Sequence, residues 1–303
     1  MSSIDEIKAS PAFAAIQPLI PDDSTPGAPI QSVVESLTSP LTPTSTPSEI
    51  STYLQTLWTG FLLHVVDSTN LREDKHIPLS ALLLAIQDTS APKGIKYPDD
   101  SQQFIWSTLP DLSIYIRDWY NFSPSSAENT APVKGIRWTT EEWIGFNGFL
   151  AVLSRETYKK YPPPLSAHTT TNTESQEIKS KRQAGDYFLY AIWALRELEV
   201  ASEKIAQVHP ADIAAAAMWL FEANEVIYQL CKDGKTYDGN VARGGEGYKD
   251  KGWKGFTVDR WSIWQNVLQS YATIVEENGE FGEAAEVAVY LAMQAVAAME
   301  RDS

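Results

Sequence analysis

The chain has 303 residues, of which 43% are hydrophobic, so it can bury a substantial core, and its formal net charge is −15 at pH 7. A surface this acidic repels phosphate backbones and anionic lipid, so we expect neither nucleic acid nor a membrane as a partner. The single cysteine, Cys231, excludes an intramolecular disulfide, and we expect it to be buried and unreactive.

The first 47 residues, 1–47, are rich in Pro, Ser and Thr and predict a loose N-terminal segment with one short helix near residues 33–37. Their beginning lacks the apolar core of a secretory signal, and no run of about 18 apolar residues follows, so we expect a cytoplasmic protein. A helix start is marked by Pro47 at the first helical position and by Glu49, which completes a capping box. Residues 48–303 are expected to form a single all-helical domain.

Apolar residues recur at spacings of three and four along much of the chain that follows, which predicts amphipathic helices. In the N-terminal half these helices cover residues 47–65, 79–87, 102–120 and 139–157. Pro110 is expected to kink or split the third of them. The polar stretch 161–179 begins with a tyrosine and three prolines, and we expect a linker or a lid there.

The C-terminal half predicts four longer helices, over residues 180–206, 210–232, 257–275 and 283–301. The second of them is apolar almost all round, which indicates a central, buried helix. A glycine-rich, locally basic loop at 233–256 precedes the third. Because no stretch alternates apolar and polar residues as a strand does, the fold class is all-α. We expect a non-parallel bundle of roughly eight to ten helices. An arrangement of these helices as degenerate helical hairpins is an alternative.

Motifs for cofactors and metals are incomplete in this sequence. The glycine, lysine and threonine at 234–236 resemble the end of a phosphate-binding loop, but Gln229 stands where the first glycine is needed. Glu73 and His76 match one half of a carboxylate di-iron motif whose second half does not occur. We therefore expect no cofactor and no metal.

Ten tryptophans, most of them on helical patterns, indicate a bulky aromatic interior that could enclose an apolar ligand. A charge buried without a partner costs several kcal/mol, so charged residues inside apolar helices are either paired or face a cavity. If they face a cavity, Glu222 and Arg260 are the expected catalytic groups. The residues expected to bind the substrate around them are Trp219, Trp261, Trp264, Tyr187, Tyr190 and Arg155.

A resemblance to a known family rests mainly on Arg260-Trp261-Ser262-Ile263-Trp264, on the glycine-rich loop before it, and on the alanine-rich final helix. With these features the chain resembles, over roughly residues 50–300, a fungal family known as domain of unknown function 3632. The resemblance implies a fungal source and a helical fold, and it brings no shared chemistry with it.

The sequence leads to one main functional hypothesis and two alternatives. The main hypothesis is a cofactor-independent cyclase or isomerase, with a pericyclic reaction as one form. It would hold an apolar metabolite of fungal specialised metabolism in an aromatic pocket, where shape and one or two polar groups supply the catalysis. The alternatives are a non-catalytic helical scaffold for protein interaction and a small-molecule carrier. Neither the substrate nor the oligomeric state follows from the sequence.

Overall fold

The computed structural model describes residues 3–20, 27–67, 73–90, 92, 95, 97, 105–121, 123–125, 138–163, 175–278 and 283–302. Ten of its α-helices, α3 to α12, have nine residues or more, and over these ranges the extended pairing is one isolated β-bridge between Thr236 and Gly255. The all-α prediction is confirmed. Within the same ranges no helix is long and apolar enough to cross a bilayer.

The chain divides into two compact units. Unit 1 contains residues 1–138 and 156–186, and unit 2 contains residues 139–155 and 187–303. Helix α7 (Thr140–Lys160) contributes to both. Residues 48–303, which the sequence suggests as one domain, thus belong to two units.

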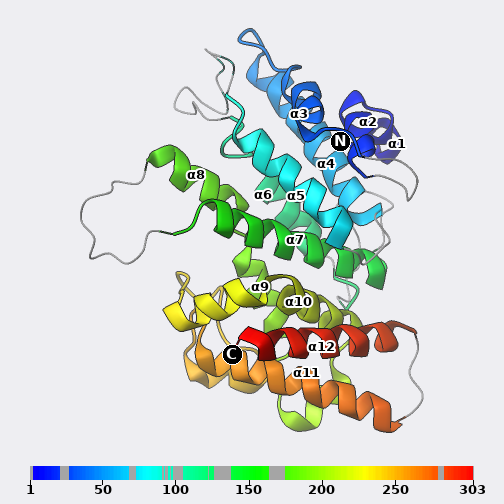
Figure 1. The fold of residues 1–303 in the computed structure, drawn as a ribbon, viewed down its shortest axis with the longest axis vertical. Coiled ribbons are helices and arrows are strands. Elements are labelled where there is room, and N and C mark those ends of the chain that lie inside the picture. The colour runs from blue at the N-terminus through cyan, green and yellow to red at the C-terminus, as the bar shows by residue number, and fades with distance from the viewer. Residues whose placement is uncertain are drawn as a thin grey trace. The chain divides into compact units, whose positions relative to one another are not determined.

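In its described ranges, unit 1 contains seven α-helices besides the end of α7, and a short 3₁₀ helix, η1 (Gln17–Leu19) (Figure 1). The α-helices are α1 (Ile4–Lys8), α2 (Pro11–Ile16), α3 (Ile30–Thr38), α4 (Pro47–Asp67), α5 (Glu73–Gln87), α6 (Leu112–Tyr120) and α8 (Gln176–Gly185).

The N-terminal segment is more helical than its proline content suggests. The short helix expected near residues 33–37 is α3, but α1 and α2 were not expected. Each has a local start signal, because Ser3 and Glu6 form a capping box and Ser10 caps α2. Tertiary contact then holds these short helices, since both pack on α4 and His64 of α4 stacks on the Phe13 ring of α2, with centroids 3.9 Å apart.

Two expected helices are shorter than their apolar patterns suggest. Residues 105–111 form turns rather than the predicted helix, and Leu109 and Asp111 adopt φ values of 44° and 68°, so α6 starts only after Pro110. The predicted helix 180–206 is interrupted after Gly185. A Cβ at Gly185 would lie 2.2 Å from the Thr157 hydroxyl, so glycine is required where α8 ends against α7.

The stretch 161–179, expected to be a linker or lid, is only partly described. Residues 164–174 lie outside the described residues, and residues 176–179 already belong to α8.

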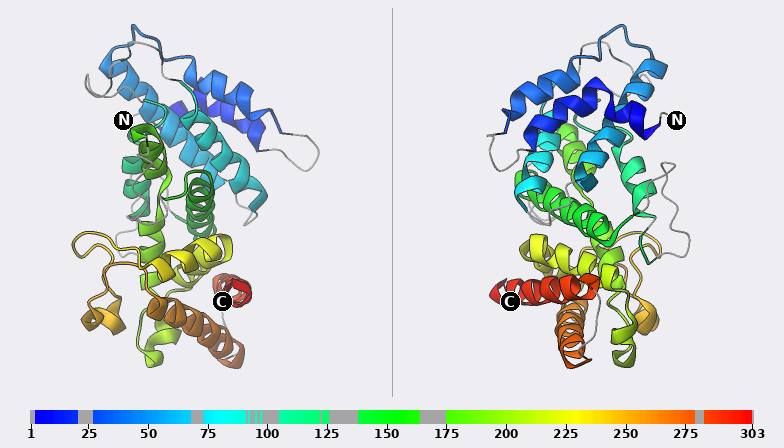
Figure 2. Two further views of the ribbon diagram at one scale, coloured as in Figure 1. Left: turned by 60° about the vertical axis from the view of Figure 1, so that its left-hand side comes forward. Right: turned by 90° about the vertical axis from the view of Figure 1, so that its right-hand side faces the viewer.

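Unit 2 is built around α10 (Pro210–Asp233), which is buried along most of its length, as its apolar sequence predicts. Helix α12 (Glu283–Asp302) packs on both α10 and α11 (Val258–Asn278), as the two further views in Figure 2 also show. Four of the side chains that α12 buries are alanines, Ala288, Ala292, Ala295 and Ala298, and small side chains allow two helices to approach closely. Helix α9 (Phe188–Arg196) and two short 3₁₀ helices, η2 (Ser202–Gln207) and η3 (Glu246–Lys251), complete the unit.

Candidate functional site

Arg260, one of the two expected catalytic residues, is fully buried in the first turn of α11. Thr257 caps that helix by accepting from the Arg260 backbone N–H at 3.2 Å, which fixes where the arginine side chain begins. Its guanidinium donates from Nε to Glu199 Oε1 at 2.6 Å. Nη1 donates to the carbonyls of Ala242 at 2.9 Å and Gly255 at 2.7 Å. The planar fork of arginine is what allows one side chain to serve so many acceptors.

Aromatic rings and one carboxylate surround this guanidinium. The rings of Trp253 and Trp264 have their centroids 5.4 and 5.5 Å from Arg260 Cζ, within the range of a cation–π interaction. Trp264 Nε1 also donates to Glu199 Oε1, at 2.9 Å. Glu199 is itself fully buried, so the pair is a desolvated ion pair whose charges are satisfied by hydrogen bonds on several sides.

The Glu199–Arg260 pair holds the glycine-rich loop in place. Glu199 Oε2 accepts from the backbone N–H of Gly245 at 2.6 Å, while Arg260 binds the carbonyls of Ala242, near the middle of the loop, and Gly255, at its end. Gly245 must be glycine, because a Cβ there would lie 2.4 Å from the carbonyl oxygen of Arg196. The guanidinium N–H groups of Arg260 therefore bind a side chain and backbone carbonyls of the protein itself, which gives this residue a structural role.

Glu222, the other expected catalytic residue, is paired with Arg155. Arg155 Nη1 donates to Glu222 Oε2 at 3.2 Å and to the Glu222 carbonyl at 2.7 Å. The backbone of α10 leaves helical geometry at the next residue, Ala223, with φ −134° and ψ 21°. A helix break exposes carbonyls that would otherwise be bonded along the helix, and here Arg155 supplies the donor. Arg155 and Glu222 are thus bonded to each other, and no hydrogen bond or ion pair among the described residues joins either of them to Arg260.

The expected pocket-lining aromatics are packed into the core of unit 2. Trp219 is fully buried and its Nε1 donates to Asn147 Oδ1 at 3.0 Å. Trp261 lies against Tyr228, with ring centroids 4.9 Å apart. Tyr187 and Tyr190 pack on each other at 5.9 Å. These contacts give each ring an aromatic or hydrogen-bonding neighbour from the protein.

Cys231 is buried and free, as the sequence predicts. Burial raises the pKa of its thiol to about 12, although Arg260 acts in the opposite direction. The thiolate is the reactive form of cysteine, so burial disfavours reaction at this thiol at neutral pH.

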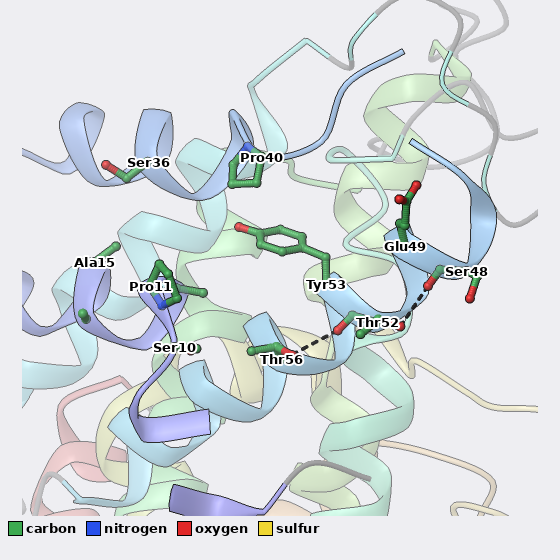
Figure 3. Close-up of a pocket in the computed structure, with 12 residues that line it drawn as sticks. Ser10, Pro11, Ala15, Ser36, Pro40, Ser48, Glu49, Thr52, Tyr53 and Thr56 are labelled. Atoms are coloured by element: carbon green, nitrogen blue, oxygen red, sulfur yellow. Dashed lines mark hydrogen bonds between the residues drawn. The ribbon is translucent and has the colours of Figure 1, made fainter. Parts of the chain in front are cut away.

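A groove in unit 1 is lined by none of these residues. It has a volume of about 980 Å³ and runs between α2, α4 and the end of α3 (Figure 3). In the close-up, Tyr53 of α4 extends between Pro40 on one side and Pro11 on the other. The remaining residues that line it are Ser10, Ala12, Ala14, Ala15, Ser36, Ser48, Glu49, Thr52 and Thr56.

The polar side chains of this groove are largely occupied by their own backbone. Ser36, Thr52 and Thr56 each donate to the carbonyl one helical turn before, at 2.9, 2.9 and 3.1 Å. Tyr53 donates to the Leu37 carbonyl at 2.6 Å, and burial raises the pKa of its phenol, which therefore stays protonated. The groove consequently offers methyl, methylene and ring surface with few free donors.

Neither the groove nor Glu199 was expected from the sequence. The groove was missed because its walls come from α2 and α3, in a segment whose prolines suggested loose chain. Glu199 could have been noticed because it stands between Leu198 and Val200, both apolar, but only the tertiary structure identifies Arg260 as its partner.

Among the described residues, no group of three or more His, Cys, Asp or Glu side chains could hold a metal ion.

A family model, described as protein of unknown function (DUF3632), matches residues 58–268. No curated protein and no solved structure matches the chain. The matched span includes Glu199, Glu222 and Arg260, whereas every residue lining the groove of unit 1 precedes it.

Proposed function

The chain belongs to the DUF3632 family of proteins of unknown function, so we propose a function from its own geometry: it binds a small apolar molecule in the groove of unit 1 without transforming it. The observation that carries this proposal is the groove of about 980 Å³ in which four hydroxyl groups, those of Ser36, Thr52, Tyr53 and Thr56, already donate to backbone carbonyls.

The size of the groove supports a small-molecule ligand. Ligand sites usually have volumes of about 300–1,000 Å³, and this groove lies at the upper end of that range. An apolar ligand would gain by leaving water, and it would not need to satisfy donors that are already bonded. Tyr53, between two prolines, supplies the one aromatic surface on which such a ligand could pack.

The contacts of the expected catalytic residues favour binding over catalysis. Glu222 binds Arg155 and Arg260 binds Glu199, so the two groups assigned to acid–base or polar catalysis have structural partners. The groove itself contains Glu49, whose Oε2 accepts from the Thr46 backbone and hydroxyl at 2.8 and 2.9 Å as part of the helix cap. The cyclase or isomerase activity stays a prediction, and the carrier alternative is the one that the groove supports.

Titration with N-phenyl-1-naphthylamine, a neutral apolar dye that fluoresces when it leaves water, tests the proposal. Two exposed serines on α3 provide a matched pair of variants. Ser36 lines the groove and Ser32 does not, and each donates to a backbone carbonyl three or four residues earlier in the chain. We expect Ser36→Trp to fill the groove and weaken dye binding about tenfold or more, a change of about 1.4 kcal/mol. Ser32→Trp should bind the dye like the unmodified protein.

A second variant in the groove, Thr52→Trp on α4, should weaken binding in the same way, which separates filling of the groove from a local effect on α3. Circular dichroism spectra and melting temperatures of all variants establish that they are folded. Saturable binding that neither groove variant affects would place the ligand elsewhere, and absence of saturable binding would exclude the proposal.

A further inference from the structure

Unit 2 has an exposed apolar surface that its own fold does not use. On α12 the side chains of Tyr290 and Met293 are 63% and 51% exposed, although both are large and apolar in most of their surface. Scattered apolar side chains are ordinary on a protein surface, but a patch beside a hollow commonly marks an interaction site. Such a hollow is present here.

The hollow is a groove of about 300 Å³ between α11 and α12. Met293, Val296, Ala297 and Glu300 of α12 form one side, and four residues of α11 form the other: Leu268, Gln269, Ala272 and Thr273. Leu268 and Ala272 are buried and form an apolar floor. The volume is at the small end of ligand sites, so it suits an anchoring side chain of a partner rather than a whole metabolite.

The exposed residues of α12 form a stripe along the helix. Residues 286, 290, 293, 297 and 300 are separated by four, three, four and three positions, which places them on one helical face. The centre of this stripe is apolar, with Tyr290, Met293 and Ala297, and each end is an exposed carboxylate, Glu286 and Glu300. Arg301 is the exposed cation that adjoins the stripe, next to Glu300.

We propose that this stripe and the groove beside it dock an amphipathic helix with basic flanks from a protein partner. An apolar face at i, i+3, i+4 and i+7 spacing would lie along Tyr290 and Met293 and place one side chain in the groove. Lys or Arg residues at its ends would face Glu286 and Glu300, and the net charge of −15 would accelerate the approach of a basic segment. Met293 adapts its shape easily, which suits a docking surface.

Charge disfavours a second copy of this chain as the occupant. If α12 packed antiparallel on its own copy, Glu286 of one chain would face Glu300 of the other. Like charges would then meet at both ends of the interface, between two proteins that each carry a net charge of −15. A basic partner makes both of these contacts favourable.

The experiment measures fluorescence anisotropy of a labelled helical peptide with Leu at i, i+3, i+4 and i+7 and Lys elsewhere, titrated with the full chain. Two comparison peptides carry Glu in place of Lys, or Gln in place of Leu. Of the three peptides, we expect only the Leu–Lys peptide to bind saturably. Its affinity should be tenfold or more weaker for the double variant Tyr290→Ser/Met293→Gln. The double variant Glu286→Gln/Glu300→Gln should reduce both the affinity and its dependence on salt.

Val258→Gln is the matched control, because Val258 is an equally exposed apolar side chain of unit 2 that does not line the groove. Equal binding of the peptide to all variants would show attraction to the net charge alone and would overturn the proposal. No saturable binding would overturn it as well. A dimer that Tyr290→Ser/Met293→Gln dissociates would identify a second copy as the occupant and contradict the basic partner. The groove of unit 1 takes no part in this test, so its result is independent of the proposed function.

Discussion

At the scale of single residues, the buried charges of unit 2 are organised as ion pairs. Arg260 bonds Glu199 and two backbone carbonyls at distances of 2.6–2.9 Å, and both side chains of the pair are fully buried. A buried pair gains little over an apolar pair of the same size, but loss of one partner leaves a charge without compensation. Arg260 is therefore expected to contribute to the free energy of unfolding, whatever the function of the protein.

Replacement of Arg260 by Met should lower the free energy of unfolding by about 3–5 kcal/mol, because Glu199 would be left as an unpaired buried carboxylate. The double variant Glu199→Gln/Arg260→Met removes that charge and should lose less than the sum of the two single variants. Urea denaturation followed by circular dichroism measures both. Arg196→Met is the control, since Arg196 is half-buried and its ion pair with the exposed Glu197 is long, at 3.9 Å, so a loss below about 1 kcal/mol is expected. A similar loss for Arg260→Met and Arg196→Met would contradict a structural role for the buried pair.

At the scale of elements, one surface aspartate joins three helices of unit 1. Asp88, directly after α5, accepts from Lys160 of α7 at 2.6 Å, from Tyr161 at 2.9 Å and from Lys181 of α8 at 3.1 Å. Partial burial opposes ionisation of Asp88, but the hydrogen bonds from these three donors outweigh it and lower its pKa. Through this cluster α8 is connected to α7 and to the end of α5.

The lowered pKa of Asp88 makes its contribution to stability dependent on pH. A carboxyl group with a lowered pKa in the folded state stabilises that state above its unfolded pKa of about 3.9, and the effect is lost as the pH falls through the folded value. Because Asp88 is half-exposed, Asp88→Asn should cost only about 0.5–1 kcal/mol at pH 7. Thermal melts from pH 7 to pH 3 should show the two proteins converging below about pH 4. A difference that persists undiminished at pH 3 would show that Asp88 acts through packing rather than through its charge.

At the scale of the whole molecule, 39 acidic residues outnumber 24 basic ones, which gives the protein its net charge of −15. Self-repulsion of a net charge destabilises a folded chain, and salt screens it. Between 0.01 M and 0.15 M ionic strength, the screening length falls from about 30 Å to about 8 Å.

The melting temperature should therefore rise by a few degrees when sodium chloride is added over that range. Tetramethylammonium chloride at the same ionic strength should act alike, because general screening does not depend on the cation. A fall in melting temperature would mean that attractive surface pairs, such as those of Asp88, outweigh the repulsion.

Much of the fold could be predicted from the sequence because the information is local. Helices α4, α7, α10, α11 and α12 lie where capping residues and a periodicity of three to four place them, within a few residues. The errors occurred where non-local contacts or unusual backbone angles decide the outcome. Gly185 ends α8 because it touches Thr157, and α2 is held by the contact of Phe13 with His64. Neither contact is visible as a spacing in the sequence.

The sequence alone determined the helical class, the buried position of α10 and the need of Glu222 and Arg260 for either a partner or a cavity. Each follows from properties of single residues and their neighbours, namely hydrophobicity, helix propensity and the cost of burying a charge. Only the tertiary structure decided between partner and cavity, by bringing Glu199 to Arg260 and Arg155 to Glu222. It also placed the larger groove among the N-terminal helices. Partners and grooves depend on which distant segments meet, and the free energy that selects those contacts is shared over the whole packed core.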